Sequence, residues 1–372
     1  MPAPGKTTSV DRLKRSAEGG VAASSPAANK QSAKKENKKN FIKEEQPPEN
    51  HKEEAEAAPP SVPPQPVDEK DYRARFCKQV LAMSPKKIFR EYKEGDMAKI
   101  KPENYTYLTY QRNEEKNRYP DILCIDETRV VLKERDATND YIHASWVKLP
   151  NGRKYICTQG PLKETLEDFW HMIVTEKSPI IVMLCNLEEQ GESKCERYYP
   201  KEGKTLTFGK YSVKYKKELK AVTSDIPVAQ YTITAGSTTH TVTHYMCQNW
   251  TDHACPVDAA PIIKLLKKVT GESKKDIITV HCSAGIGRTA TFLGIEYASL
   301  KVQSESDFKM EQLLRELRAQ RFHAVQGGTQ YLFLHVALLQ MWSAEGIVSP
   351  ESCQSFFDSY KRTMTHMISR KK

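Results

Sequence analysis

A cysteine and an arginine six positions apart carry the clearest potential for chemistry in this sequence. They are Cys282 and Arg288, and the residues between them are Ser283, Ala284, Gly285, Ile286 and Gly287. A run rich in small residues favours a loop whose main-chain N–H groups point inward toward an anion. A helix that begins at the end of the loop adds partial positive charge. The ligand that this pattern predicts is a tetrahedral oxyanion.

The side chains of this stretch suit phosphate-ester chemistry. Cys282 is the candidate nucleophile, because helix N-termini and nearby cations favour the reactive thiolate of a cysteine. Arg288 offers a planar fork that can bind two phosphate oxygens together. Thr289 places a hydroxyl near the sulfur, where it could assist the departure of a covalent intermediate. A buried cysteine is nevertheless more often a small hydrophobe than a catalyst, so this pair alone does not establish a function.

The elements that must position this stretch are visible in the hydrophobic pattern. Residues 277–280 are apolar or β-branched and predict a buried strand, and residues 289–299 predict a helix. Residues 179–185 predict a second buried strand. Several runs between residues 205 and 245 alternate polar with β-branched residues, which indicates antiparallel strands with one solvated face.

The composition limits the class of protein. The chain has 372 residues, a formal net charge of +10 and nine scattered cysteines without metal-type C-x-x-C pairs. A reduced setting is therefore favoured over a disulfide scaffold. No apolar run approaches the roughly 20 residues of a membrane span, and the N-terminus lacks the apolar core of a signal peptide. We expect a soluble intracellular protein, cytoplasmic with a nuclear location left open.

Residues 1–69 differ in composition from the rest. They are poor in large apolar residues, basic around 34–39, and acidic and proline-rich over 44–66. We expect a disordered tail, followed by one folded domain at residues 70–368. The basic block could contact nucleic acid, an import receptor or an acidic surface, although a solvated tail without a dedicated partner is the commoner case.

The string H-C-S-A-G-I-G-R-T at 281–289 resembles the active-site loop of the phosphotyrosine-specific protein tyrosine phosphatases, of the non-receptor type. Four further motifs match the family in chain order, and they are K-N-R-Y at 116–119, E-Q-G-E-S-K-C at 189–195, N-W-T-D-H-A-C-P at 249–256, and R-A-Q-R to Q-Y at 318–331. The resemblance spans about residues 71–368. It implies a single α/β domain with a highly twisted mixed sheet flanked by helices, no metal, no cofactor, and phosphotyrosine proteins in signal transduction as substrates.

The resemblance also assigns the substrate-binding residues. Tyr119 stacks on the substrate ring and sets a pocket depth at which phosphotyrosine reaches Cys282 and phosphoserine does not. Asp121 accepts hydrogen bonds from the substrate backbone and fixes its register. The loop residues 283–287 hold the phosphate oxygens.

The remaining roles concern the reaction itself. By resemblance, Asp252 is the general acid, and such an acid contributes a factor of ~10²–10⁴ in rate. After Cys282 has been phosphorylated, Asp252 acts as a base on a water molecule that Gln326 orients. Gln330 matches the second glutamine of the same motif. Arg288 holds the equatorial oxygens during both steps.

Four residues support this set by resemblance. Glu189 pairs with Arg288, and Lys194 approaches the loop that carries the general acid. His281 precedes the nucleophile, and Trp250 belongs to the general-acid motif.

The chain departs from the family pattern at four motif positions. His143 replaces an asparagine, which brings the local hydrogen bonding into question more than the chemistry. Thr251 and Ala254 replace a proline and a glycine in the general-acid loop, and loss of the proline should alter its open and closed populations. Gly327 replaces a threonine, and Gly328 adds a further glycine, so this loop is expected to be looser. We expect activity, which these changes could reduce.

Three other readings stay open. A weakly active or inactive phosphotyrosine-binding pseudophosphatase is suggested by Thr251 and Gly327, although Cys282, Arg288 and Asp252 argue against it. A dual-specificity phosphatase shares the C-x5-R core but not the K-N-R-Y loop. A nucleic-acid-binding protein would use the positive charge, yet this charge is dispersed and no aromatic-basic stretch stands out.

Overall fold

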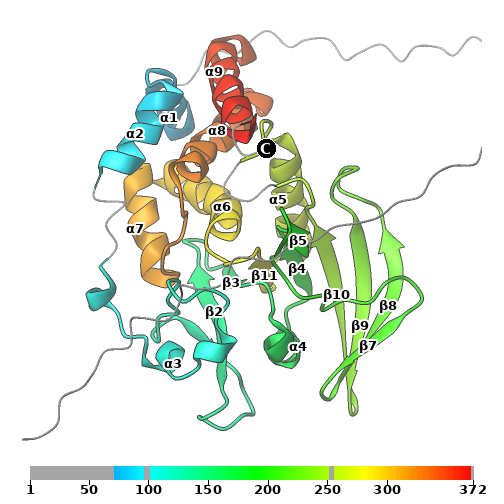
Figure 1. Cartoon of the computed structure of the whole chain (residues 1–372). Helices are drawn as coiled ribbons and strands as arrows, with labels where there is room; N and C mark the ends of the chain where they lie inside the picture. The colour runs from blue at the N-terminus through cyan, green and yellow to red at the C-terminus, as the bar shows by residue number, and fades with distance from the viewer. Residues whose placement is uncertain (1–70, 96–100, 251–254, 370–372) are drawn as a thin grey trace, which may run out of the picture. The chain divides into compact units, whose positions relative to one another are not determined.

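The computed structural model describes residues 71–95, 101–250 and 255–369 (Figure 1). The predicted tail at 1–69 lies outside these residues. So do Thr251, Asp252 and Ala254 of the general-acid motif.

A mixed nine-stranded sheet forms the framework of the described residues, in the order β1-β2-β3-β11-β4-β10-β9-β8-β7 (Figure 1). Its strands are β1 (Arg129–Val131), β2 (Tyr141–Lys148), β3 (Lys154–Thr158), β4 (Ile180–Met183), β7 (Thr205–Phe208), β8 (Tyr211–Leu219), β9 (Val228–Ala235), β10 (Thr238–Met246) and β11 (Ile278–His281). The neighbours β3, β11, β4 and β10 run parallel, and the other pairs are antiparallel. A separate hairpin consists of β5 (Glu188–Glu189) and β6 (Glu192–Ser193). The predicted mixed sheet is thereby confirmed.

Helices lie on both sides of this sheet. The α-helices are α1 (Tyr72–Leu81), α2 (Pro85–Glu94), α3 (Leu108–Gln111), α4 (Leu166–Thr175), α5 (Ala260–Ser273), α6 (Arg288–Ser304), α7 (Met310–Gln320), α8 (Gly328–Ala344) and α9 (Pro350–Ser369). Short 3-10 turns occur at η2 (Pro102–Asn104), η3 (Glu114–Lys116) and η4 (Lys163–Thr165). Figure 1 shows α4 on the side of the sheet opposite to α5 and α6. None of the helices in the described ranges is long and apolar enough to cross a membrane.

The local signals in the sequence explain where the first helices begin. The side chain of Asp71 accepts a hydrogen bond from the N–H of Arg73 at the start of α1. Ser84 does the same for Lys87 at the start of α2, where Pro85 occupies the first helical turn. Both helices therefore begin at a residue whose side chain caps the first turn.

The difference between the central and outer strands follows from their burial. All four residues of β4 and of β11 are buried, because helices cover both faces of this parallel region. In β8, buried residues alternate with more exposed ones at the start of the strand, as the period-two pattern predicts. The central strands therefore end inside the protein, where β11 delivers the cysteine loop.

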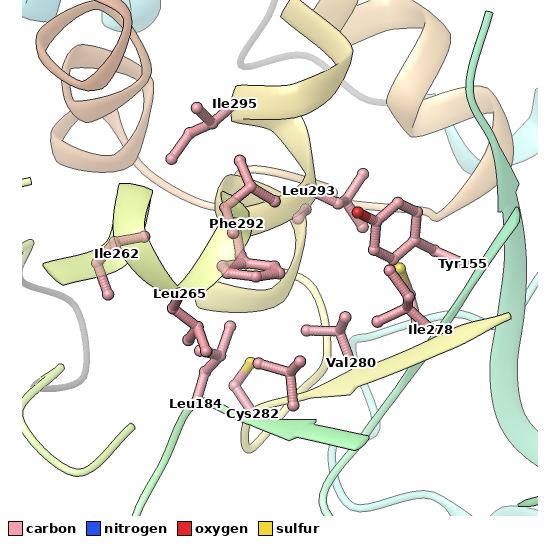
Figure 2. Close-up of a cluster of buried hydrophobic side chains, with 14 of the residues drawn as sticks. Tyr155, Leu184, Ile262, Leu265, Ile278, Val280, Cys282, Phe292, Leu293 and Ile295 are labelled. Carbon is pink, nitrogen blue, oxygen red and sulfur yellow. The ribbon is translucent and has the colours of Figure 1, made fainter. Parts of the chain in front are cut away.

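A continuous apolar core fixes the position of that loop (Figure 2). Ile278 and Val280 of β11 are fully buried, and so are Phe292 and Leu293 of α6. Figure 2 shows these side chains directed toward one another, with Cys282 beside them at the edge of the cluster. Burial of one such side chain stabilises the fold by about 1.5–3 kcal/mol, so the strand and helix on either side of the loop are both firmly anchored.

Candidate active site

The cysteine loop, residues 282–287, connects the end of β11 to the first turn of α6. Gly285 adopts a φ of +71°, and a Cβ atom at this position would lie 2.2 Å from the carbonyl oxygen of Thr158. Both the backbone conformation and the close approach to β3 therefore require glycine. The loop closes against the end of the sheet, as an anion-binding turn at a helix N-terminus must do.

The sulfur of Cys282 lies at the floor of this loop and is only 3% exposed at the residue level. The main-chain N–H of Gly285 donates to its Sγ atom at 3.2 Å. His281, immediately before it, lies with its Nδ1 atom 3.1 Å from the carbonyl oxygen of Cys282. The sulfur is thus held by an N–H group of its own loop, and the main chain of Cys282 is held by His281.

A buried hydrogen-bonded chain extends from His281 to β10. The hydroxyl of Tyr198 lies 2.7 Å from Nε2 of His281 and 2.7 Å from Nε2 of His244. Because Nδ1 of His281 faces a carbonyl oxygen, Nδ1 carries a proton, and the hydroxyl of Tyr198 is placed to donate to Nε2. Burial lowers the pKa of His244 to about 3, so this ring is neutral and donates its Nε2–H to Tyr198. The network has one consistent direction, and it orients His281 behind the nucleophile.

Arg288 is held in a fixed orientation at the start of α6. Its Nη1 atom donates to Oε1 of Glu189 at 2.7 Å and to the carbonyl oxygen of Trp250 at 2.8 Å. The residue is 1% exposed. The indole ring of Trp250 packs against Phe333 of α8, with ring centroids 5.4 Å apart. A buried carboxylate and a packed carbonyl therefore aim this guanidinium.

A second buried arginine, Arg321, anchors the other side of the cysteine loop. It donates to the carbonyl oxygens of Ala284 and Gly285, each at 3.1 Å. It also donates to Oγ of Ser145 at 3.2 Å and to Nδ1 of His143 at 3.0 Å. The carbonyl groups of the loop are turned outward by these bonds, which leaves its N–H groups facing the opposite way.

His143 keeps both of its ring nitrogens hydrogen-bonded at the position where asparagine was expected. Its Nε2 atom donates to the carbonyl oxygen of Ile122 at 2.8 Å, and its Nδ1 atom accepts from Arg321. Burial and the neighbouring Arg321 lower the pKa of His143 to about 3, which keeps the ring neutral. The expectation of disturbed hydrogen bonding at this departure was therefore wrong.

The loop with the K-N-R-Y motif forms one wall above the sulfur. The hydroxyl groups of Tyr119 and Ser283 lie 2.7 Å apart, which connects this wall to the cysteine loop. The hydroxyl of Tyr110 donates to the carbonyl oxygen of Pro120 at 2.8 Å and supports the wall from behind. Asp121 follows as an exposed side chain at the rim.

These walls enclose a cavity of about 190 Å³ that opens onto the sulfur. Its lining residues are Tyr119, Asp121, Ile122, Glu192, Lys194, Cys282, Ser283, Ala284, Gly287, Arg288 and Gln326. Sequence reasoning missed Glu192 and Ile122. The distance of two residues from the candidate Lys194 was the available signal for Glu192, but a two-residue strand is too short to establish which face it presents.

Other predicted site residues lie behind the cavity. The carbonyl oxygen of Ile286 accepts from the N–H of Val325 at 2.9 Å. The hydroxyl of Thr289 is buried and has no hydrogen-bond partner in the described part of the chain. Gln330 accepts from the N–H of Gln326 at 2.8 Å and so positions that residue.

The two glycines of the glutamine loop led us to expect a looser loop. One of them, Gly328, has a packing role. Gly328 is the first residue of α8, and a Cβ atom there would lie 2.9 Å from the ring of Phe89. Gly327 caps the same helix, and its carbonyl oxygen accepts from the N–H of Gln330 at 3.0 Å. Close packing against α2 explains the second glycine.

Within the described ranges, no group of three or more histidine, cysteine, aspartate or glutamate side chains is arranged to bind a metal ion. Asp252 lies outside the described residues, so its place relative to the cavity is not part of this geometry.

The comparisons with known proteins identify the family of this chain. The sequence pattern that defines the family described as protein-tyrosine phosphatase matches residues 113–340, which is more than half of the chain. The chain belongs to the protein-tyrosine phosphatase family.

Its curated relatives are much longer proteins. Receptor-type tyrosine-protein phosphatase C from Homo sapiens is 38% identical over 237 residues, which cover 61% of this chain and 18% of the relative. Tyrosine-protein phosphatase 69D from Drosophila melanogaster is 37% identical over 235 residues, which cover 60% of this chain and 16% of the relative. The similarity therefore concerns one part of those proteins.

Solved structures of PTPN18 resemble almost the whole described domain. One, from work on its fingerprint on distinct HER2 tyrosine phosphorylation sites, aligns with a TM-score of 0.66 and 28% identity. Another, of PTPN18 in complex with HER2 phosphopeptides, has a TM-score of 0.66 and 27% identity. Each alignment covers 73% of this chain and 99% of the solved chain.

Proposed function

We propose that this protein hydrolyses phosphotyrosine in proteins through a cysteinyl-phosphate intermediate. The observation that carries the proposal is the cavity of about 190 Å³, which has the sulfur of Cys282, the guanidinium of Arg288 and the ring of Tyr119 in its lining. This combination supplies a nucleophile, a bidentate phosphate ligand and an aromatic wall at one place. It is the minimum that transfer of a phosphoryl group from an aryl oxygen requires.

In the first step the thiolate of Cys282 attacks phosphorus, and the bond between phosphorus and the tyrosine oxygen breaks. Arg288 and the N–H groups of the cysteine loop hold the three equatorial oxygens, where negative charge is concentrated. Asp252 gives its proton to the leaving tyrosine oxygen. Support for this orientation comes from Glu189 and Trp250, which fix the guanidinium on the side away from the cavity.

In the second step a water molecule attacks phosphorus, and the sulfur leaves as a thiolate. Asp252, now ionised, takes the proton of the water, which Gln326 orients at the cavity wall. Gln330 holds the backbone of Gln326 in place. The buried hydroxyl of Thr289 serves the departing sulfur. The products are inorganic phosphate and the regenerated enzyme.

Specificity for phosphotyrosine follows from the depth of the cavity. The sulfur lies at the floor of the cavity, and Tyr119 stands in its wall. A phosphoserine side chain is shorter by the length of an aromatic ring, so its phosphorus would stop short of the sulfur. Asp121 at the rim is placed to accept hydrogen bonds from the main chain of the substrate.

We also propose that the protein acts in a reducing, cytoplasmic setting as a non-receptor phosphatase. All nine cysteines are free, and the proposed nucleophile requires reduced sulfur. Fluorescence of the tagged full-length chain should be diffuse in the cytoplasm. Exclusive labelling of the plasma membrane would overturn this assignment.

The deciding experiment is phosphate release from a phosphotyrosyl peptide by the purified protein. Turnover should be confined to phosphotyrosine and absent with the phosphoseryl peptide of the same sequence. It should be abolished in Cys282→Ser, which replaces the sulfur with a poor nucleophile. In Asp252→Ala it should fall by about 10²–10⁴-fold, while the peptide still binds.

The alternative function is a phosphotyrosine-binding module without turnover. It is favoured by Thr251 and Gly327, two departures in the loops that handle protons and water. Peptide binding without phosphate release by the unmodified protein would replace the proposed hydrolase with this module.

A further inference from the structure

The charges around the cavity differ in their exposure. Its cations are covered, since the side chains of Arg288 and Lys194 are only 1% and 10% exposed. Its carboxylates lie at the opening, where Asp121 is exposed and the side chain of Glu192 is 74% exposed. A phosphate entering the cavity meets positive charge, whereas the residues that flank it in a peptide meet negative charge.

The hairpin β5–β6 places two carboxylates in opposite environments. Glu189 and Glu192 are cross-strand partners, so their side chains project from the same face. Glu189 is buried against Arg288, while Glu192 reaches the rim of the cavity. One carboxylate therefore serves the catalytic arginine, and the other pairs with Lys194 while its side chain stays largely exposed to solvent or a ligand.

The neighbouring cations do not fully neutralise the negative charge at the rim of the cavity. Lys194 donates to one carboxylate oxygen of Glu192 at 2.7 Å, and the side chain of Glu192 remains 74% exposed. Arg118 donates to the main-chain carbonyl oxygens of Gly160 and Pro161, and to that of Ser193. In the described ranges, Asp121 has no ion pair. The rim thus presents carboxylate oxygens outward, while the nearby cations are occupied by groups of the protein.

Resting on the proposed function, we propose that Glu192, together with Asp121, selects phosphotyrosine segments that carry lysine or arginine next to the phosphotyrosine. The phosphate enters the cavity, and a basic side chain one or two residues away bonds the rim carboxylates. Acidic neighbours are repelled by the same two groups. Glu192 is then a specificity residue of the substrate site as well as the ion-pair partner of Lys194.

The test measures binding, so that it does not depend on turnover. Two peptides carry the non-hydrolysable difluorophosphonate analogue of phosphotyrosine, flanked on both sides by lysine in one and by glutamate in the other. The dissociation constants are measured with the full-length protein and with Glu192→Gln. Glu188→Gln is the matched control, because Glu188 is an exposed carboxylate of the same hairpin outside the cavity lining.

The unmodified protein should bind the lysine peptide about three- to tenfold more tightly than the glutamate peptide, since exposed ion pairs contribute factors of this size. Glu192→Gln should reduce this ratio about two- to fivefold, and Glu192→Lys should bring it to unity or invert it. Glu188→Gln should leave it unchanged. In 1 M salt, where the screening length is about 3 Å, the ratio should approach unity.

The two proposals fail in different ways. An equal change in both dissociation constants upon Glu192→Gln would show that the carboxylate only supports Lys194, and it would overturn the specificity proposal. A tighter complex with the glutamate peptide would also overturn it. Selective binding without phosphate release leaves the specificity role standing and removes the hydrolase. Absence of binding to both peptides removes both proposals.

Discussion

Two buried arginines flank the cysteine loop, and their surroundings are opposite. Arg288 is paired with one carboxylate, that of Glu189, and is a lining residue of the cavity. Arg321 has no ion pair in the described part of the chain and is held by four neutral acceptors. The first arrangement places an ion-paired guanidinium in the cavity lining, while the second uses a charge to organise backbone.

The comparison separates a residue that acts on substrate from one that positions the loop. A carboxylate balances part of the charge of Arg288, so its guanidinium can remain ionised and ordered in a site that alternates between empty and occupied. The four acceptors of Arg321 include two carbonyl oxygens of the loop itself. Substitutions at the two positions should therefore affect different quantities.

The largest effect is expected on turnover from Arg288→Lys. Lysine preserves the charge beside Glu189 but cannot bind two phosphate oxygens in one plane. We expect kcat/KM for a phosphotyrosyl peptide to fall about 10²–10³-fold, as on removal of a transition-state donor. The free energy of unfolding, measured in urea, should change by only about 1 kcal/mol. Activity within tenfold of the unmodified protein would contradict the catalytic role of this arginine.

Arg321→Met should act chiefly on stability. Each buried acceptor that loses its donor costs about 1–3 kcal/mol, and part of this cost is relieved by relaxation, so a loss of about 3 kcal/mol is expected. Arg90→Met is the matched control, because the side chain of Arg90 is 68% exposed and should contribute no more than about 0.5 kcal/mol. Equal losses in the two variants would mean that the bonds of Arg321 do not support the fold.

The comparison of the two arginines also shows which features could be predicted from the sequence alone. The strand before Cys282 and the small-residue loop have local patterns, and both were predicted. Arg321 and His143 are separated by 178 positions, and no local period connects them. Tyr198 and His281 are 83 positions apart. Their roles arise from tertiary packing, and hence only the structure identifies them.

Glu192 illustrates an intermediate case. Its distance from Lys194 along the chain was visible in the sequence, but a two-residue strand gives too short a pattern to establish which face it presents. The hairpin pairing and the burial of Glu189 determine this. A rim residue of this kind becomes recognisable only when the depth of its neighbours is known.

The neutral ring of His143, one of the acceptors of Arg321, should make the stability of the fold depend on pH. The pKa of His143 is lowered to about 3 in the fold, against about 6.5 in an unfolded chain. Between these values the unfolded state binds more protons, so stability is complete above pH 6.5 and is lost as the pH falls toward 3. His143 alone should contribute a slope approaching about 1.4 kcal/mol per pH unit.

His143→Asn tests this slope, since an amide can still donate to Ile122 and accept from Arg321 without titrating. Urea unfolding between pH 7.5 and 4.5 should show that the variant loses less stability per pH unit, by the slope that corresponds to nearly one proton. Above pH 7 the stability of the two proteins should change with pH in parallel. The buried His244 adds a slope of the same sign in both proteins. Identical slopes below pH 6 would exclude His143 as a titrating group.

The smallest effect is expected from Ser145→Ala, which removes one of the four acceptors of Arg321. A hydrogen bond that involves a charged group contributes about 1.5–3 kcal/mol, but the guanidinium keeps three other partners, so we expect a loss of about 1 kcal/mol and turnover within twofold. Combining it with Arg321→Met should make the serine change cost less, because the two residues share one bond. By contrast, Glu189→Gln removes the one charged partner described for Arg288 and should cost about 3 kcal/mol. If the serine change alone destabilises the protein as much as Arg321→Met, the support of the loop rests on that one bond instead of on four.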